Sequence, residues 1–441
     1  MHLREAIKSA LPTVMRRCAG KFLRQVRKTA LLPAKHIKAW RAPRLHNRLL
    51  ADHRDVRPIR VMFLISNTAS WKVGPVFTQM MNDPEFDPIV IVCPNTNGLL
   101  STTSGHTADL ACRYLETEGF AYIDLNGKSE VEGRIEIQKI DPHLVFFTNP
   151  HRLVPKHLHD ELLTSRITCY VPYHHEVMEY GDNQDQYNQD SHNAFWHVFV
   201  PHEESRRSFL KTRIRSDTGV TVSGFPACEP FLASALPREP SPWKPQGKPK
   251  LRIIYAPHWL WNSDIKMATI DTYGEAMMRL AEKHCDDVQW SLRPHPMLKP
   301  KLMNLAEWGP QRTEDFFTFW KRSDFCQIYE EDYIPLFKTS DAMIHDSGSF
   351  LAEYLYLKKP VLYLMTEQTG DKYFNSFGRR AIKACSIGRS VDDIERFLDK
   401  MLEKGTENQN YDNSFFKQDI APLFQTPPSL KICDEIKRAF S

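Results

Sequence analysis

The sequence contains no long apolar run and no cysteine framework. No stretch of about 18 apolar residues occurs, so no segment is expected to cross a bilayer. Basic residues from Arg16 to Arg24 interrupt the apolar runs near the start, so no signal peptide is expected. The nine cysteines are scattered, without a Cys-x-x-Cys pair, which argues against a structural zinc or a disulfide scaffold. These absences predict a cytoplasmic protein with reduced thiols.

Common nucleotide-binding and hydrolase motifs are absent as well. The chain has no Gly-x-Gly-x-x-Gly and no Walker A loop, which argues against a dinucleotide dehydrogenase or a P-loop kinase. It has no Gly-x-Ser-x-Gly elbow, which argues against an α/β-hydrolase. The pairs Asp286-Asp287 and Asp392-Asp393 fall on predicted helices and read as solvated faces. We therefore expect no metal cofactor.

The charge is unevenly distributed along the chain. The whole sequence has a net charge of +4, but residues 1–56 alone carry +11, so the remainder carries −7. Within residues 1–50, apolar side chains recur at three-to-four spacing between Arg and Lys. This pattern is typical of a helix on an anionic membrane surface. A solvated helix packed on the body and a nucleic-acid-binding arm are the alternatives.

Beyond this arm, short apolar runs typical of buried parallel strands alternate with helical patterns. The first series covers residues 59–65, 88–93, 120–125, 144–147, 167–171, 197–200 and 220–223. The second series covers residues 251–255, 288–292, 325–329, 342–345 and 361–364. A Pro- and Lys-rich stretch over residues 236–250 separates the two series and is typical of a linker.

Alternating strands and helices predict two Rossmann-like, doubly wound α/β domains that face each other across a cleft. The expected division is a basic arm over 1–56, an N-terminal domain over 57–238, a C-terminal domain over 239–405 and a tail with a helix over 406–441. Ligands of such sheets bind at the carboxyl ends of the strands. The turns that follow the strands are therefore the candidate sites.

The turn after residue 345 is the strongest candidate for binding an anion. Asp346, Ser347, Gly348 and Ser349 lead from a strand into a helix, whose free N–H groups favour a phosphate. Glycine allows a close approach, the two hydroxyls add donors, and Glu353 one turn later could accept hydrogen bonds from ribose. The simpler alternative is that Asp346 and Ser347 only cap the helix.

Two other strand ends of the second series carry donor groups. Arg293 and His295 alternate after a buried strand, so both can face a pyrophosphate from one side of an extended chain. His258 follows the strand that begins the second domain, and we expect it to donate to the same diphosphate. The aromatic residues beside it, Tyr255 and Trp259, could line a nucleoside pocket or belong to the core.

In the first domain, His174, His175 and Glu176 follow a strand and are expected to face the cleft. A histidine beside a carboxylate suits a general base that deprotonates a hydroxyl. The alternative is one packed and one exposed histidine. Asn149, His151 and the stretch 201–204 stand at other strand ends and could shape an acceptor site.

The second half of the chain resembles the CDP-glycerol glycerophosphotransferase-like family. Three motifs of that family match in order, at Tyr255-Ala-Pro-His-Trp259, at Arg293-Pro-His-Pro296 and at Ser340 through Ser349, with Glu353 and Lys359-Pro360 following. The sequence departs from the family pattern at Gly348, where a serine is usual, and at Leu260, where a basic residue is usual. Tyr173-His174-His175 only echoes the family's Trp-His-Gly.

The resemblance implies the two-domain glycosyltransferase B (GT-B) fold and a metal-independent transferase. It implies a nucleotide-activated donor such as CDP-glycerol, whose glycerol-phosphate, polyol-phosphate or sugar group moves to a lipid-linked or growing surface polysaccharide of the teichoic-acid or capsule type. By resemblance, His174 or His175 activates the acceptor hydroxyl. The residues that would hold the donor phosphates are Arg293, His295, Ser347, Gly348 and Ser349.

Members of the family commonly carry a basic membrane-binding element, so the expected location is the inner face of the cell membrane, with the arm on anionic lipid. Two other classes remain open. A UDP-sugar 2-epimerase shares the fold and would need no basic arm. A nucleic-acid-binding protein could use the arm, although the acidic body carries no motif for reading RNA or DNA.

Overall fold

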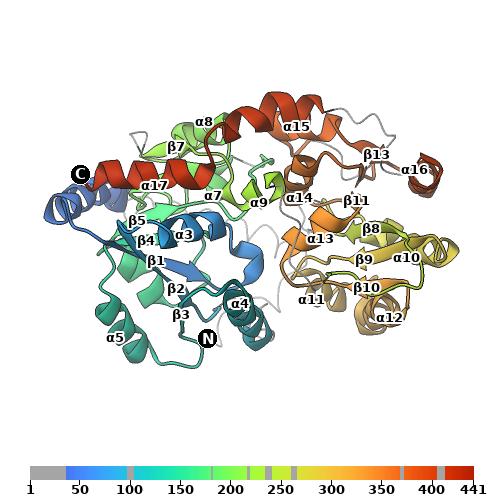
Figure 1. The fold of residues 1–441 in the computed structure, drawn as a ribbon, viewed down its shortest axis with the longest axis horizontal. Coiled ribbons are helices and arrows are strands. Elements are labelled where there is room, and N and C mark those ends of the chain that lie inside the picture. The colour runs from blue at the N-terminus through green and yellow to red at the C-terminus, as the bar shows by residue number, and fades with distance from the viewer. Residues whose placement is uncertain are drawn as a thin grey trace, which may run out of the picture.

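The structure is a computed structural model that describes residues 36–96, 104–179, 182–215, 219–233, 241–259, 266–367, 372–404 and 413–441. Two parallel β-sheets form the centres of two domains that stand side by side (Figure 1). The predicted fold class is confirmed for these residues. Residues 1–35, which make up most of the predicted basic arm, lie outside the described residues.

The N-terminal domain contains a seven-stranded parallel sheet in the order β3-β2-β1-β4-β5-β6-β7. Its strands are β1 (Ile59–Ile65), β2 (Phe86–Val92), β3 (Tyr122–Asp124), β4 (Leu144–Phe147), β5 (Ile167–Tyr170), β6 (His197–Val200) and β7 (Val220–Val222). The order reverses between β1 and β4. A crevice at their carboxyl ends is therefore expected to bind ligands.

The C-terminal domain repeats the arrangement with a six-stranded parallel sheet in the order β10-β9-β8-β11-β12-β13. Its strands are β8 (Leu251–Ala256), β9 (Val288–Leu292), β10 (Cys326–Ile328), β11 (Ala342–His345), β12 (Val361–Leu364) and β13 (Ser386–Gly388). Here the order reverses between β8 and β11. The sequence predicted five of these strands and missed the short edge strand β13.

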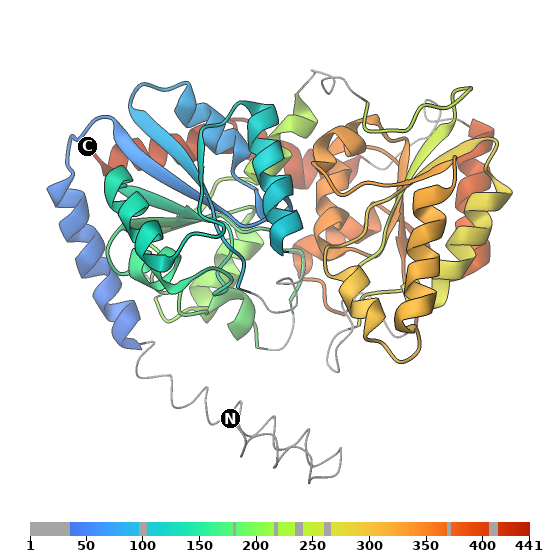
Figure 2. The same cartoon turned by 90° about the horizontal axis from the view of Figure 1, so that it is seen from below.

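Helices cover both faces of each sheet (Figures 1 and 2). Those of the N-terminal domain are α3 (Gly74–Met81), α4 (Ser104–Glu118), α5 (Glu130–Ile140), α6 (Asp160–Leu163), α7 (Gln184–Tyr187), α8 (Glu203–Thr212) and α9 (Glu229–Leu232). Those that follow are α10 (Ile270–Lys283), α11 (Leu298–Met303), α12 (Gly309–Arg322), α13 (Tyr333–Thr339), α14 (Gly348–Glu353), α15 (Ser376–Lys383), α16 (Val391–Lys404) and α17 (Pro428–Ala439). None of the described helices is long and apolar enough to span a bilayer.

Each central strand contributes to two cores, because successive side chains point to opposite faces of the sheet. In β1, Phe63 packs in the core beneath α3 and α17, whereas Met62 and Leu64 pack in the core on the opposite face. This burial on both faces explains why the strands read as continuous apolar runs rather than alternating ones.

One predicted helix is misplaced. The sequence pattern near residues 301–308 predicts a helix there, but α11 ends at Met303 and a turn leads into the 14-residue α12. Helix α12 buries Phe316 and Trp320 against the sheet. It starts directly after Trp308, where Gly309 adopts a positive φ of 69° that favours glycine.

The C-terminal helix α17 returns to the N-terminal domain, where Ile432, Cys433 and Ile436 enter the core beside α3. Lys437 forms ion pairs with Asp83 at 2.5 Å and with Glu85 at 2.7 Å. The two domains are thus connected twice by the chain, once through the linker after β7 and once through α17.

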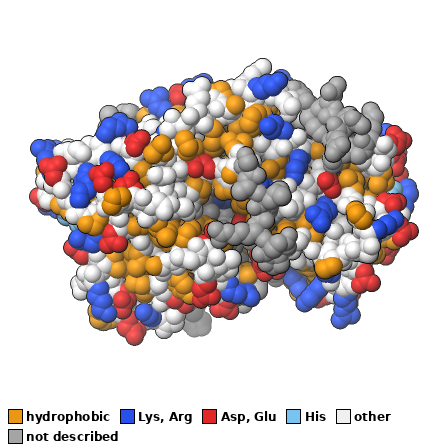
Figure 3. Space-filling model, in the orientation of Figure 1, with side chains coloured by type: hydrophobic (Ala, Val, Ile, Leu, Met, Phe, Trp, Pro, Cys, Tyr) orange, Lys and Arg blue, Asp and Glu red, His pale blue; other side chains and the backbone are white. Residues whose placement is uncertain are grey.

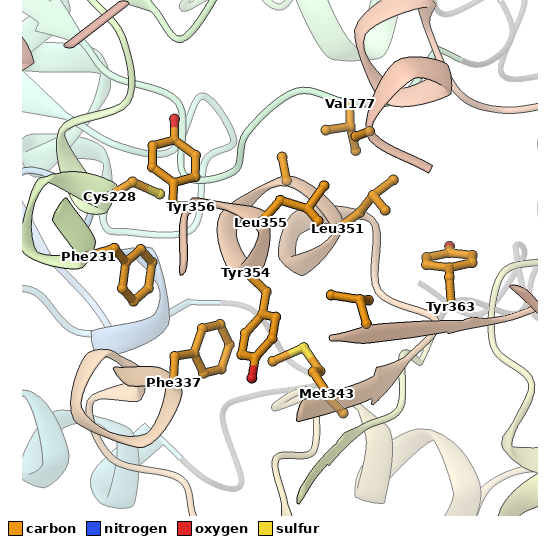
Figure 4. Close-up of a cluster of buried hydrophobic side chains, with 14 of the residues drawn as sticks. Val177, Cys228, Phe231, Phe337, Met343, Leu351, Tyr354, Leu355, Tyr356 and Tyr363 are labelled. Atoms are coloured by element: carbon orange, nitrogen blue, oxygen red, sulfur yellow. The ribbon is translucent and has the colours of Figure 1, made fainter. Parts of the chain in front are cut away.

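An apolar cluster also joins the domains (Figure 4). Two residues of the N-terminal domain take part, Cys228 just before α9 and Phe231 within it. They pack against Phe337 and Tyr356 of the C-terminal domain. The rings of Phe231 and Phe337 stack with centroids 5.9 Å apart and an 8° interplanar angle. The domains are therefore in direct apolar contact on this side.

A helix over residues 36–52 lies at the outer edge of the N-terminal domain, drawn in blue in Figure 2. It packs through Ala39, Ala42 and His46, which are buried. On its other side Ile37 and Trp40 are 50% and 62% exposed. Acidic and basic side chains are interspersed over the face of the molecule shown in Figure 3.

Candidate functional site

The strand register of the C-terminal sheet brings three predicted turns together. The carboxyl end of β8 lies between those of β9 and β11, since Tyr255 pairs with Leu292 and Ala256 with His345. As a result, the backbone N–H of His258 donates to Asp346 Oδ1 at 2.5 Å. The rings of His258 and His295 lie 5.2 Å apart. Residues from three separate motifs thus meet at one edge of the sheet.

Asp346 ties this edge together. It is completely buried, and its Oδ2 accepts hydrogen bonds from the Thr269 N–H at 2.6 Å and from the Thr269 hydroxyl at 2.8 Å. Burial raises the pKa of this carboxyl to about 6, against the opposing effect of these hydrogen bonds. Both oxygens are engaged inside the protein, so Asp346 positions the turn.

Ser347 occupies the N-cap of α14 but makes no side-chain capping hydrogen bond. The alternative that this serine merely caps the helix therefore does not describe the structure. Ser349 lies in the first turn of α14 and is half-buried. Both residues follow the carboxyl end of β11, which lies beside that of β8.

Gly348 lies against the N-terminal domain. A Cβ atom placed there would lie 2.9 Å from Sδ of Met178, a residue of the N-terminal domain. The open side of the glycine is thus filled by Met178, so the glycine permits the domains to approach each other. A phosphate would therefore have to approach the turn from a side other than the one that faces Met178.

Three histidines at the cleft share one hydrogen-bonding arrangement. The Nδ1 atoms of His174, His295 and His345 each accept the backbone N–H two residues further on, at 3.0, 3.1 and 3.1 Å. A neutral imidazole that accepts at Nδ1 carries its proton on Nε2. Burial lowers the pKa of His174 to about 4 and that of His345 to about 3, and lowers that of His295 well below 6.5. At neutral pH all three are uncharged Nε2–H donors.

His345 was not singled out from the sequence. It is the last residue of β11, it is completely buried, and its Nε2 has no partner among the described residues. The only signal in the sequence is its place directly before Asp346. A buried donor of this kind, at a strand end beside other donors, adds to the anion-binding character of the edge.

Arg293 lies at the end of β9 and is 8% exposed. Its guanidinium donates to the carbonyl of Tyr329 at 2.9 Å, which fixes the side chain along the edge of the sheet. Burial lowers its pKa, while the nearby Asp332 opposes that effect. Tyr255, in contrast, is completely buried against Trp320 in the core, so only Trp259, half-buried and 5.5 Å from the His295 ring, remains a candidate nucleoside contact.

The adjacent residues His174 and His175 are placed very differently. His174 is half-buried, whereas His175 is completely buried between the domains. There its Nε2 lies 2.9 Å from the Tyr356 hydroxyl, and its ring stacks on Phe377 at 5.2 Å. Burial lowers its pKa to about 3. This is the alternative of one packed and one exposed histidine, and it leaves only His174 as a candidate to act on a substrate.

Glu176 does not pair with the neighbouring imidazoles as the sequence predicted. Its backbone N–H, not its carboxyl, contacts His174. The carboxyl is 1% exposed, with Oε2 unpartnered among the described residues, and burial raises its pKa to about 8. It is therefore protonated at neutral pH. Its backbone carbonyl accepts a 2.6 Å hydrogen bond from Asn375 of the C-terminal domain, and its φ of 49° is unusual for a glutamate.

Glu353, the last residue of α14, is completely buried. Its Oε2 accepts a 2.6 Å hydrogen bond from the Tyr333 hydroxyl. Lys72 of the N-terminal domain reaches the same oxygen at 3.5 Å. The sequence singled out Glu353 but gave no signal for Lys72, because nothing in the chain order relates the two.

The N-terminal domain has its own crevice, where the strand order reverses. A cavity of about 30 Å³ at the ends of β1 and β4 is lined in part by Ser66, Thr148, Asn149 and His151. A second cavity of about 380 Å³, lined in part by Lys128 and Lys156, lies nearer β3 and away from the C-terminal turns. Over the part of the chain that the structure describes, no group of side chains is arranged to hold a metal ion.

A family model described as CDP-glycerol:poly(glycerophosphate) glycerophosphotransferase matches residues 173–416, more than half of the chain. This range contains every predicted catalytic and donor-binding residue, whereas Asn149 and His151 of the expected acceptor site lie before it. No protein of curated function matches the sequence.

Solved structures match the fold over almost the whole chain. The wall teichoic acid polymerase TagF is 13% identical with a TM-score of 0.55, and the match covers 96% of this chain and 98% of TagF. A TagF variant soaked with CDPG gives a TM-score of 0.53 at 13% identity and the same coverage. The UDP-GlcNAc 2-epimerase of Methanocaldococcus jannaschii, in complex with UDP-GlcNAc and UDP, is 14% identical with a TM-score of 0.52, covering 86% of this chain and 99% of the epimerase. The predicted GT-B arrangement is thus confirmed.

Proposed function

The chain belongs to the CDP-glycerol:poly(glycerophosphate) glycerophosphotransferase family, and on this premise we propose what it transfers and how. The protein is a transferase of the GT-B fold. We propose that its donor is CDP-glycerol or a related CDP-polyol, and that its acceptor is a lipid-linked or growing cell-surface polymer. The chemical step is attack of an acceptor hydroxyl on the phosphorus that bears the polyol.

The observation that carries this proposal is the convergence of donors at the carboxyl edge of the C-terminal sheet. His258 and His295 lie 5.2 Å apart there, next to the turn that Asp346 ties to the β8 end. Ser347 and Ser349 add hydroxyls, and Arg293 adds a charge. Phosphoryl transfer needs little covalent chemistry from a protein and depends on positioning and on stabilising the charge of the phosphate oxygens. A set of neutral and cationic donors in a half-buried edge supplies both.

In the proposed step, a bond forms between the acceptor oxygen and the polyol-bearing phosphorus. The bond from that phosphorus to the bridging oxygen breaks, and CMP leaves with the electron pair. The acceptor hydroxyl passes its proton to bulk water as the bond forms. In the arrangement seen here, His174 accepts at Nδ1 and carries its proton on Nε2. We therefore propose that its Nε2–H donates a hydrogen bond to the phosphoryl group during the transfer. The role of general base, which the sequence predicted, would require that proton to move to Nδ1 first.

Two substitutions at His174 distinguish these roles. His174→Gln retains an N–H donor but cannot take up a proton, whereas His174→Ala removes both abilities. If His174 is a donor, the glutamine variant should retain at least about tenfold more turnover than the alanine variant, since one charge-assisted hydrogen bond is worth roughly 1.5–3 kcal/mol. Equal loss in both variants would favour the general base.

A donor screen tests the proposed function itself. CDP-glycerol, CDP-ribitol and common UDP-, GDP- and CMP-sugars are titrated into the wild type and into His295→Ala by calorimetry. The proposal expects the CDP-polyols to bind best and His295→Ala to weaken them about tenfold or more. Preferential binding of UDP-GlcNAc followed by its epimerisation would instead support the 2-epimerase alternative.

We also propose that the protein sits on an anionic membrane surface, where a lipid-linked acceptor would be found. Support comes from the helix over residues 36–52, whose exposed side presents Ile37 and Trp40 together with Arg41, Arg44 and Arg48. The Arg44 guanidinium lies 3.7 Å from the Trp40 ring centroid. Exposed aromatic and basic side chains on one helix favour the headgroup region of a bilayer. We expect this surface to be the inner face of the cell membrane.

A further inference from the structure

A lysine of the N-terminal domain ends inside the C-terminal domain. Lys72 lies between a short 3-10 turn (Thr68–Ser70) and α3, and its side chain is only 4% exposed. Its Nζ donates to the Tyr333 hydroxyl at 2.8 Å and lies 3.5 Å from Glu353 Oε2. The Tyr333 hydroxyl in turn donates to the same Glu353 oxygen at 2.6 Å. The three side chains form one buried chain of hydrogen bonds across the domain interface.

The electrostatic environment makes this contact specific. Buried charges persist only when they are paired, and here the ammonium of Lys72 is compensated by the Glu353 carboxylate. The ring of Tyr333 adds a cation–π contact, with Nζ 4.5 Å from its centroid, and Phe225 contributes a second at 5.9 Å. Separation of the domains would remove the only cation that the described residues place on this carboxylate.

The other oxygen of the carboxylate is not used by the protein. Glu353 Oε1 is buried and has no hydrogen-bond partner among the described residues. An ionised carboxylate is an acceptor only, so this oxygen suits a ligand that brings O–H or N–H groups. Glu353 stands four residues after Ser349 on α14, so the two lie about one helical turn, roughly 6 Å, apart on the same face. In a nucleoside diphosphate, the ribose hydroxyls are separated from the phosphates by a similar length.

We propose that Lys72 is a positioning residue for the donor nucleotide: it holds Glu353 through Oε2 so that Oε1 accepts hydrogen bonds from the vicinal hydroxyls of the ribose. This inference rests on the proposed function, since it presumes a nucleotide at the C-terminal edge. Because Lys72 belongs to the opposite domain, the carboxylate reaches its binding orientation only when the two domains are in contact. Recognition of the ribose is thereby linked to closure of the cleft.

Two nucleotides that differ only in the hydroxyls of the ribose test whether Glu353 contacts those hydroxyls. The affinities of CDP and of 2′,3′-dideoxy-CDP are measured by calorimetry on the full chain, and their ratio is the readout. The wild type should prefer CDP by about tenfold or more, as expected for hydrogen bonds to a buried carboxylate. Glu353→Gln and Lys72→Met should each reduce the preference to less than about threefold. The double variant should show no further loss, because both changes act through the same carboxylate.

Matched variants control for a general effect on the interface. Arg379→Met removes another interdomain ion pair, between Arg379 and Glu179 at 3.2 Å, where the side chains are 49% and 44% exposed. It should leave the CDP preference unchanged. Tyr333→Phe removes the hydroxyl that donates to Oε2 without altering the charges, and it should lower the preference even where Lys72→Met does not fold.

The outcomes separate this inference from the proposed function. If CDP does not bind the wild type at all, the nucleotide site itself is wrong. If CDP binds and Glu353→Gln loses the preference while Lys72→Met and Tyr333→Phe retain it, the donor site stands and the role of Lys72 is refuted. If the wild type does not distinguish CDP from its dideoxy analogue, Glu353 does not contact the ribose, and the inference fails for that reason.

Discussion

The carboxyl edge of the C-terminal sheet and the segment over residues 173–179 of the N-terminal domain illustrate two ways of building a site. At the C-terminal edge, residues distant in the sequence converge, so that His258, His295 and Asp346 form one network. In the segment 173–179, adjacent residues diverge, and His175 and Glu176 are buried while His174 remains partly accessible. The difference arises from what fixes each backbone.

Strand register fixes the C-terminal turns, because each follows directly from a paired parallel strand. The segment 173–179 lies beyond its strand and is held by the other domain. Its backbone contacts residues 373–378 through hydrogen bonds that join Glu179 with Tyr373 at 2.7 Å and Asn375 with Val177 at 3.0 Å. Adjacent residues can therefore turn in opposite directions, according to what the C-terminal domain presents to each.

Removal of Asp346 should have the largest effect, because it breaks the convergent network at its centre. Asp346→Ala leaves the N–H groups of His258 and Thr269 without their acceptor in a buried position. We expect a loss of about 3–5 kcal/mol in the free energy of unfolding, measured by chemical denaturation, together with loss of nucleotide binding. Asp341→Asn changes a half-buried aspartate outside the cleft edge, and its free energy of unfolding and nucleotide binding are measured for comparison. A stable Asp346→Ala variant that still binds CDP would contradict the network.

Glu176 tests the divergent segment through pH. Its folded-state pKa of about 8 lies above the reference value of 4.5, so folding keeps a proton that the unfolded chain releases. Below about pH 4.5 the carboxyl is protonated in both the folded and the unfolded chain, so it does not affect the free energy of unfolding. As the pH rises from there to about 8, the free energy of unfolding falls by up to about 1.4 kcal/mol per pH unit. Glu176→Gln removes this dependence. We expect the variant to gain about 2–4 kcal/mol over the wild type on going from pH 5 to pH 8.

The difference in unfolding free energy between the two proteins is the relevant quantity, because it cancels the titration of the buried histidines. The measurement consists of urea denaturation of wild type and Glu176→Gln at several pH values. A difference that stays constant with pH would mean that Glu176 is ionised in the folded protein. Its burial between the domains would then be incorrectly described.

The adjacent histidines should separate activity from stability. His174→Ala removes a donor from the cleft and should lower kcat about 100-fold with little effect on the melting temperature. His175→Ala removes a ring packed against Phe377 and should cost about 2–4 kcal/mol of stability while the folded fraction retains its kcat. Steady-state kinetics and thermal unfolding of both variants provide the check. Equal effects on kcat would show that the two residues do not diverge as described.

The smallest expected effect concerns the helix over residues 36–52. Trp40→Ala should weaken binding to vesicles containing anionic lipid by about 1–2 kcal/mol, since one exposed aromatic side chain is lost. Turnover with a soluble acceptor should not change. Cosedimentation with anionic and neutral vesicles measures the effect, and binding that depends only on salt and not on Trp40 would favour a purely electrostatic contact.

The sequence predicted most of this fold because buried parallel strands leave a strong local signal. β1, β4, β6, β9, β11 and β12 were placed at their observed bounds, since short, mostly apolar runs rich in branched and aromatic residues have few alternatives. The edge strand β13 reads Ser-Ile-Gly and pairs on one side only, so it lacks that signal. Helix α12 was missed because its apolar face is formed mainly by Phe and Trp among many charges.

The sequence predicted those site residues that belong to a local motif. It did not predict those that meet only through contacts between the two domains. Arg293, His295 and the turn 346–349 follow strands, so their neighbourhood followed from topology. Lys72 reaches Glu353 across the domain interface, and no periodicity or spacing in the chain relates the two. The contact of Gly348 with Met178 had no signal in the sequence for the same reason, because Met178 belongs to the other domain.

The central claim is transfer of a polyol-phosphate from a CDP-activated donor, and the leaving nucleotide tests it most directly. Phosphorus-31 NMR of a reaction with CDP-glycerol and a polyol-phosphate acceptor identifies that nucleotide. The account predicts CMP, released together with growth of the acceptor by glycerol-phosphate units, and a loss of this signal in His295→Ala. Release of CDP would show transfer of the polyol without its phosphate, and the absence of turnover with any CDP-polyol would contradict the account altogether.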